Sequence, residues 1–318
     1  MEYLKENEHI TCQFEEYAQL ISLICGHIPN EEFEKVTQDL LNITDNLVRK
    51  DVTRFGKNLK TWESIVCCNL NPIKTKTLSN AIEGLLPKLM VFLQESIYDE
   101  NLFNTIYEFE RIMIQTNHVH LSPHMIDILI LNSTLFMQKE NKNFKKTFIL
   151  SISLLDCLLR HRKPMIMDRL PPFLQQFRVI LKSLCQKSNS DLSLEDVFVR
   201  EISDCAHELE KFTRNLVYCQ KDMGRIAMYL IADILEQYEK TTLYPGVKIH
   251  LNNCVYSLIS VCDQHAVTYL MRVLSSASTE IFKLTHTTPH ISLSFNIAYF
   301  DDVRTLMRQL TVESQDRS

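Results

Sequence analysis

The chain of 318 residues contains 5 glycines and 9 prolines, carries a net charge of −5 and is 45% hydrophobic. At average usage about 22 glycines would be expected, and no two of the five lie close enough in sequence to build a phosphate-binding loop. This composition excludes dinucleotide-binding and P-loop folds, which need glycine where the backbone approaches phosphate. The mildly acidic charge argues against a dedicated nucleic-acid-binding protein.

The ten cysteines stand mostly in apolar helical contexts, such as that of Cys157, and form no C-x-x-C motif. They are predicted to be small buried side chains of a protein in a reducing compartment. The charged first ten residues do not resemble a signal peptide, and no apolar run approaches the roughly 20 residues that cross a bilayer. We therefore expect a soluble intracellular protein.

Hydrophobic residues recur at helical spacing through nearly the whole chain. The first predicted helix runs from Phe14 to about Gly26, and the second from Asn30, a candidate N-cap, to about residue 54. A further helix is expected to start near Pro164. In chain order the other predicted helices cover 58–70, 75–96 with a kink at Pro87, 100–116, 123–138, 143–162, 173–187 after the interrupting Pro171-Pro172 pair, 193–219, 223–240, 247–262, 264–273 and 277–285. One segment, 291–300, has a pattern compatible with an extended conformation.

About a dozen helices with short links predict an all-α protein. Their lengths favour an irregular HEAT-like α-solenoid of stacked antiparallel helix pairs. We find no sequence repeat at a fixed period, which argues against ankyrin and tetratricopeptide arrays. A compact irregular bundle is the alternative.

Charge is segregated along the chain. Residues 139–187 hold 11 Lys and Arg against three acids, a local net charge of +8, whereas 191–210 holds seven acids and a single Arg. Clustered cations favour a surface that contacts RNA or an acidic partner; solvated helix faces paired with neighbouring acids are the alternative. The candidate contact residues are Lys142, Lys145, Lys146, Arg160, His161, Arg162, Lys163, Arg169 and Arg178.

The chemical motifs are weak. His118, His120 and His124 are the best candidates for zinc ligands, but no H-E-x-x-H motif or cysteine accompanies them, so a polar loop between helices is expected. Asp263, beside Cys262, is expected to cap the following helix rather than to take part in catalysis. Serine-hydrolase and kinase signatures are missing from the sequence. We predict no enzyme, no cofactor and no metal; a small helical hydrolase or metal enzyme using the three histidines is the alternative.

Three stretches resemble a known family: LLDCLLRHRKPMIMDRLPPFLQQFRVILKSL at 154–184, FTRNLVYCQKDMGRIAMYLIADIL at 212–235, and LYPGVKIHLNNCVYSLISVCDQHAVTYLMRVLSSASTEIFK at 243–283. They are similar to the carboxy-terminal domain of the unhealthy ribosome biogenesis protein two family of nucleolar pre-ribosomal-associated proteins, most clearly over 150–285. The resemblance implies a non-catalytic helical-repeat protein of the nucleus and nucleolus. Its implied role is early assembly of the large ribosomal subunit and processing of precursor rRNA.

The resemblance also implies partners and a division of the chain. The partners are pre-ribosomal particle proteins, among them a larger helical-repeat sister scaffold and a DEAD-box helicase, with precursor rRNA as a candidate contact. The expected regions are an N-terminal helical-repeat segment, a family-like domain and a divergent tail, at 1–140, 141–287 and 288–318. A generic cytoplasmic helical-repeat adaptor that binds a peptide or helix in its groove is the alternative. The matching positions, expected to serve packing and docking rather than catalysis, are Leu170, Pro171, Arg214, Tyr256, Asp263, Phe282 and Lys283.

Overall fold

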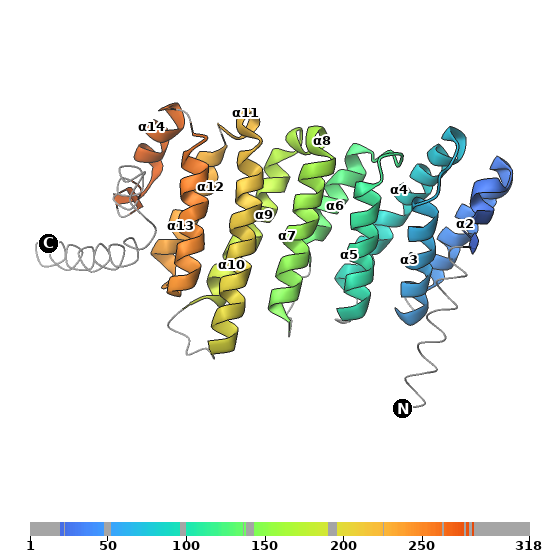
Figure 1. Cartoon of the computed structure of the whole chain (residues 1–318), viewed down its shortest axis with the longest axis horizontal. Coiled ribbons are helices and arrows are strands. Elements are labelled where there is room, and N and C mark those ends of the chain that lie inside the picture. Colours follow the sequence, from blue (N-terminus) through green and yellow to red (C-terminus); the bar gives the residue numbers. More distant parts are fainter. Residues whose placement is uncertain are drawn as a thin grey trace, which may run out of the picture. The chain divides into compact units, whose positions relative to one another are not determined.

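The computed structural model describes residues 20–21, 23–47, 52–95, 100–135, 137, 143–189, 196–224, 226–262, 264–276, 278–279 and 282. In this part of the chain the regular elements are helices, labelled in Figure 1, and the sole β-type pairing is an isolated antiparallel bridge between Asn189 and Leu243. The predicted all-α class is therefore confirmed. None of the described helices is both long and apolar enough to span a membrane.

The helices follow one another with short connections. Their bounds are α2 Asn30–Leu47, α3 Val52–Val66, α4 Pro72–Glu95, α5 Glu100–Gln115, α6 Pro123–Leu135, α7 Phe144–His161, α8 Lys163–Met167, α9 Leu170–Lys187, α10 Asp196–Val217, α11 Gln220–Met223, α12 Ala227–Lys240, α13 Pro245–Ile259 and α14 Gln264–Val273. The predicted extended segment 291–300 lies outside the described residues.

The chain forms two compact units, each with its own core. Unit 1 takes its described residues from Met1–Lys142 and Ser153–Gln176, and unit 2 from Asn143–Ile152 and Phe177–Ser318. Helices α7 and α9 therefore each contribute residues to both units.

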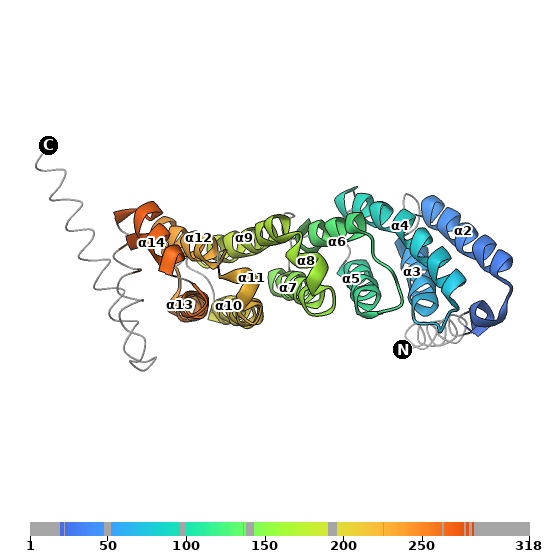
Figure 2. The same ribbon diagram turned by 90° about the horizontal axis from the view of Figure 1, so that it is seen from above.

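Unit 1 packs its helices in two layers. Helices α2, α4 and α6 lie side by side in one layer, and α3 and α5 lie in the other (Figure 2). The apolar stripes of these helices meet between the layers, where Phe55 of α3 stacks on Phe92 of α4 with ring centroids 4.5 Å apart. Neighbouring helices pack antiparallel, as the sequence predicted.

The helix predicted over residues 30–54 is wrong in extent, because α2 ends at Leu47 and a separate helix, α3, begins at Val52. A single straight helix would place Thr44 and Asn58 about 21 Å apart. Instead the Thr44 hydroxyl donates a 2.8 Å hydrogen bond to Asn58 Oδ1 and accepts a 3.2 Å bond from Trp62 Nε1. The reversal buries Trp62 completely, which a continuous helix would leave exposed on one face.

Prolines mark the starts of several helices. Helix α9 begins at Leu170, so Pro171 and Pro172 lie in its first turn rather than interrupting the chain ahead of a helix at 173. The missing N–H of proline is tolerated there, because the first turn has no intrahelical acceptor for it. Helix α8 starts beside Pro164, as predicted, and α13 starts at Pro245.

Unit 2 is organised around the contact between α10 and α13. Helices α12 and α14 lie in one layer, with α10 and α13 in the other (Figure 2). Gly246 in the first turn of α13 allows the close approach, because a Cβ there would lie 2.7 Å from the Ser203 hydroxyl oxygen of α10. This tight crossing positions the polar side chains described below.

Candidate functional site

The basic segment contains a sharp corner where α7 ends at His161 and α8 begins at Lys163. We call Arg160, His161, Arg162 and Lys163 the α7–α8 corner. Arg160, His161 and Lys163 are exposed, whereas Arg162 is half-buried. Arg160 forms an ion pair of 2.6 Å with Asp156 one turn earlier, and its side chain remains 61% exposed. The Lys163 side chain forms no hydrogen bond or ion pair with the described part of the chain.

Arg162 points inward and holds the chain that leaves α5. Its Nε donates to the Ile114 carbonyl at 3.1 Å, and its Nη2 donates to the carbonyls of Thr116 at 2.7 Å and Val119 at 3.3 Å. These carbonyls lie at or beyond the end of α5, where no backbone N–H of the helix is left to donate to them. Burial lowers the pKa of the Arg162 guanidinium. This residue therefore has a structural task in unit 1.

Other cations of the segment are paired within their own unit. Lys145 lies 2.6 Å from Asp204, Arg169 lies 2.8 Å from Asp127, and Arg178 lies 2.5 Å from Asp233. The backbone N–H of Lys146 donates to Asn143 Oδ1 at the start of α7. Lys142 lies outside the described residues. The predicted contact residues that are described thus belong to both units, with Lys145, Lys146 and Arg178 in unit 2 and the others in unit 1.

A polar depression of about 390 Å³ lies between α9 and α12 in unit 2. We call it the α9–α12 groove. Its walls carry both signs of charge: Arg178 and Lys182 from α9 face Asp233 and Glu236 from α12. Burial raises the pKa of Asp233, although the hydrogen bond and charge of Arg178 partly offset it. The groove is suited to a partner that is itself charged.

The family-like positions differ in burial where they are described. Leu170 and Phe282 are buried, Tyr256 is half-buried, and Pro171 is exposed in the first turn of α9. Asp263 and Lys283 lie outside the described residues. Arg214 has a more specific role in the polar cluster described below.

The three histidines of the 118–124 loop do not come together as metal ligands in the described part of the chain. His118 Nε2 lies 2.9 Å from the Val66 carbonyl oxygen, which fixes that ring against the end of α3. His120 and His124 are exposed. His118 and His120 lie in the connection between α5 and α6, and His124 lies in the first turn of α6.

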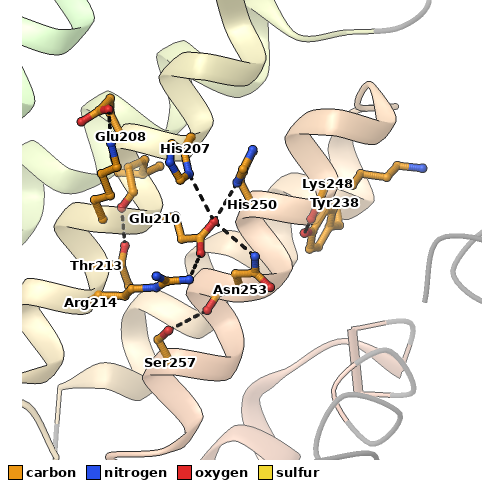
Figure 3. Close-up of polar contacts among 12 residues, drawn as sticks. His207, Glu208, Glu210, Thr213, Arg214, Tyr238, Lys248, His250, Asn253 and Ser257 are labelled. Atoms are coloured by element: carbon orange, nitrogen blue, oxygen red, sulfur yellow. Dashed lines mark hydrogen bonds and ion pairs between the residues drawn. The ribbon is translucent and has the colours of Figure 1, made fainter. Parts of the chain in front are cut away.

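Sequence reasoning missed a polar cluster between α10 and α13 (Figure 3). Its centre is Glu210, whose side chain is only 3% exposed. One carboxylate oxygen, Oε1, pairs with the Arg214 guanidinium one turn later on α10. The other, Oε2, accepts hydrogen bonds from His250 Nδ1 at 2.7 Å and from Asn253 Nδ2 at 3.2 Å, both on α13.

A second histidine faces the same carboxylate. His207 Nδ1, one turn before Glu210 on α10, lies 3.9 Å from Oε2, and its ring centroid is 4.9 Å from that of His250. We call His207, Glu210, Arg214, His250 and Asn253 the Glu210 cluster.

The cluster keeps its carboxylate charged. Burial alone would raise the pKa of Glu210, but the hydrogen bonds from His250 and Asn253, together with the Arg214 charge, outweigh burial and hold the pKa below its ordinary value. The spacing of His207, Glu210 and Arg214 at i, i+3 and i+7 places them on one helix face, and this signal is visible in the sequence. Its partners on α13 follow 40 residues or more after Glu210, and no local pattern connects them to it.

Comparison with known proteins assigns the chain to a family. The model of the Urb2/Npa2 family matches residues 104–286, more than half of the chain. The chain belongs to the Urb2/Npa2 family. The match covers the α7–α8 corner, the α9–α12 groove and the Glu210 cluster. No solved structure matches the chain.

Membership in the Urb2/Npa2 family confirms the resemblance seen in the sequence. The family implies a ribosome biogenesis factor that associates with pre-ribosomal particles and suggests a nucleolar location. It is not known as a family of enzymes.

Proposed function

We propose that the chain is a non-catalytic scaffold factor of the nucleolus, acting in large-subunit assembly and in processing of precursor rRNA. The observation that carries this proposal is the Urb2/Npa2 family match over residues 104–286. The layered, antiparallel packing within each unit supports an irregular HEAT-like α-solenoid as the architecture of such a scaffold. Its partners are pre-ribosomal particle proteins, including a larger helical-repeat sister scaffold and a DEAD-box helicase.

The contact surface we propose is the exposed part of the α7–α8 corner. Arg160, His161 and Lys163 are exposed at a helix end, where cations are free to meet RNA phosphates or the acidic side chains of a partner. Arg162 is not included in the test, because its hydrogen bonds to three carbonyls give it a structural task.

The role in ribosome assembly is tested by depletion and purification. Depleting the protein from cells should reduce free large subunits and lead to accumulation of unprocessed precursor rRNA. Affinity purification of the tagged chain should recover that precursor and the sister scaffold. Normal rRNA processing after depletion, with no pre-ribosomal protein recovered, would contradict the proposed function.

The contact surface needs a separate test with a charge-matched control. The variant Arg160→Glu/Lys163→Glu should reduce co-sedimentation of the chain with pre-ribosomal particles several-fold. The control Lys76→Glu/Arg272→Glu makes the same change in net charge at two exposed positions elsewhere and should sediment normally. Unchanged sedimentation of the first variant would rule out this surface and leave the function in place.

The α9–α12 groove favours a second candidate function, an adaptor that binds a charged peptide or helix. Nuclease treatment separates the two candidates. A scaffold assembled on precursor rRNA should leave the heavy fractions after nuclease treatment, whereas an adaptor held by a peptide should keep its partner.

A further inference from the structure

The Glu210 cluster contains three potential metal ligands on two helices. The ligand atoms of His207, Glu210 and His250 all lie within 4.8 Å of one another, the one such group among the described residues. We propose that these three residues bind a divalent transition-metal ion, best matched by Zn²⁺, which joins α10 to α13. This proposal is independent of the proposed function in ribosome assembly.

The distances fit a tetrahedral ion with a small adjustment. Zinc bonds to imidazole nitrogen and carboxylate oxygen are about 2.0–2.2 Å long, so neighbouring ligand atoms around the ion lie about 3.3 Å apart. The two separations from Glu210 Oε2 fall on either side of this value: 2.7 Å to His250 Nδ1 and 3.9 Å to His207 Nδ1. To bind the same ion, the exposed His207 side chain would have to turn inward, because the three ligand atoms lie up to 4.8 Å apart.

The donor set also fits the chemistry of zinc. Two imidazoles and one carboxylate form a recognised zinc ligand set, with a fourth position left for water. The remaining polar groups hold the carboxylate in place: Arg214 pairs with Oε1, and Asn253 Nδ2 donates to Oε2 from α13. Such contacts orient metal ligands in known sites. An ion bound at Oε2 would take the place of the hydrogen bond from His250.

A hydrogen-bond network without metal explains only part of the cluster. The bond from His250 to Glu210 needs no ion, but His207 Nδ1 at 3.9 Å is beyond hydrogen-bonding distance. Its ring nevertheless lies beside that of His250, with centroids 4.9 Å apart. Two imidazoles directed at one carboxylate oxygen are what a shared ion requires.

The test is titration of the chelator-treated full chain with Zn²⁺ at pH 7.5, followed by calorimetry. We expect one ion bound per chain and a higher melting temperature in its presence. Co²⁺ should bind at the same place and give the visible absorption of a tetrahedral site.

Two variants make the test specific. His207→Ala should weaken Zn²⁺ binding at least tenfold while the metal-free variant remains folded, because the change removes only the ring contact with His250 and leaves the hydrogen bond from His250 to Glu210 in place. The control His120→Ala/His124→Ala removes the two exposed histidines of the 118–124 loop and should bind Zn²⁺ normally.

Three outcomes would overturn the proposal: no stoichiometric binding, equal affinity in His207→Ala, or loss of binding in the control. The first would leave a plain hydrogen-bonded cluster between the helices. The last would move the ion to the 118–124 loop.

Discussion

Glu110 is a carboxyl group on α5 that is completely shielded from water. Its Oε1 accepts a 2.6 Å hydrogen bond from Asn132 Nδ2 of α6, while its Oε2 and the Asn132 Oδ1 have no hydrogen-bond partner among the described residues. Burial raises the pKa of Glu110 to about 8, although the bond from Asn132 works in the opposite direction. The carboxyl group therefore keeps its proton at neutral pH.

Replacing Glu110→Gln should stabilise unit 1. In the unfolded chain the carboxyl group loses its proton near pH 4.5, whereas in the folded chain it keeps it up to about pH 8, so stability falls between these values. Glutamine removes this loss and supplies an N–H for the unpartnered Asn132 oxygen. We expect a gain of about 1–3 kcal/mol in unfolding free energy at pH 7.5 and a smaller gain at pH 5, measured by urea denaturation.

A control for that measurement is Glu83→Gln, at an exposed position of α4. It should change the unfolding free energy by less than about 0.5 kcal/mol at either pH. An equal gain from Glu110→Gln at pH 5 and pH 7.5 would contradict the raised pKa.

Arg162→Ala should destabilise the protein by about 2–4 kcal/mol, because three backbone carbonyls lose charged donors in a half-buried position. The neighbouring Arg160→Ala should change stability by less than about 0.5 kcal/mol, since the Arg160 side chain of the ion pair with Asp156 is 61% exposed. Chemical denaturation of both variants checks the difference. Equal effects would mean that the inward position of Arg162 is not maintained in solution.

At the scale of elements, the α10–α13 crossing depends on a missing side chain. A Cβ on Gly246 would lie 2.7 Å from the Ser203 hydroxyl oxygen and 3.3 Å from the Ser203 Cβ. Gly246→Ala should therefore cost about 1 kcal/mol, because the hydroxyl must rotate or the helices must separate. The double variant Gly246→Ala/Ser203→Ala should recover most of that loss. A double-mutant cycle of urea midpoints measures the coupling, and additive effects would exclude the contact.

The same crossing should respond to acid through Glu210. Because the folded state lowers the pKa of this carboxyl group, its contribution is complete above about pH 4.5 and is lost as pH falls through the folded pKa. Glu210→Gln should destabilise the protein at pH 7 and should flatten the loss of stability below about pH 4.5. Urea midpoints measured from pH 7 to pH 3 test this, with the half-buried neighbour in Glu208→Gln as the control. Parallel curves for Glu210→Gln and the unmodified protein would contradict it.

The sequence predicts a helix well where the helix buries one apolar stripe. It predicts a helix end less well where that end depends on contacts between residues that are far apart in the sequence. Helical spacing places both ends of α5, α7 and α14 within about one residue of their observed positions, whereas the helix predicted over 223–240 starts four residues before α12 does. It does not predict the break after Leu47, because the bonds joining Thr44 to Asn58 and Trp62 form only once α3 folds back. The short α11 is missed because four residues contain no period.

The same limit applies to the candidate site. The spacing of His207, Glu210 and Arg214 is local and is visible in the sequence. The approach of His250 to Glu210, 40 residues earlier in the chain, depends on the α10–α13 crossing, which the contact of Gly246 with Ser203 helps to fix. Conversely, the concentration of charge at 139–187 is evident from composition, but the inward turn of Arg162 is not.

At the scale of the whole molecule, the burial of the cysteine thiols allows the packing of the core to be tested by their reactivity. Among the described thiols Cys67 is exposed and Cys262 is half-buried, and the others are buried. Burial raises the pKa of Cys185, Cys205 and Cys254 to about 12. Such thiols react slowly, because the thiolate is the reactive form.

In a Cys12→Ser background, which removes the cysteine outside the described residues, a thiol reagent at pH 8 should label Cys67 first and Cys262 second. The seven buried thiols should react at least tenfold more slowly until urea unfolds the chain. Mass spectrometry of the labelled peptides identifies the sites. Rapid labelling of Cys185 or Cys254 in the native protein would contradict the packing of unit 2.

The division of α7 and α9 between the two units has a topological consequence. The chain enters unit 2 at Asn143, returns to unit 1 at Ser153 and leaves it again after Gln176. No single cut in the backbone therefore yields two complete halves. A fragment ending near residue 142 lacks the Arg162 side chain that holds the end of α5, and a fragment starting there carries Ser153–Gln176 without the rest of its core. We therefore expect proteolysis or truncation at one point to unfold residues on both sides of the cut, so that both units lose structure together.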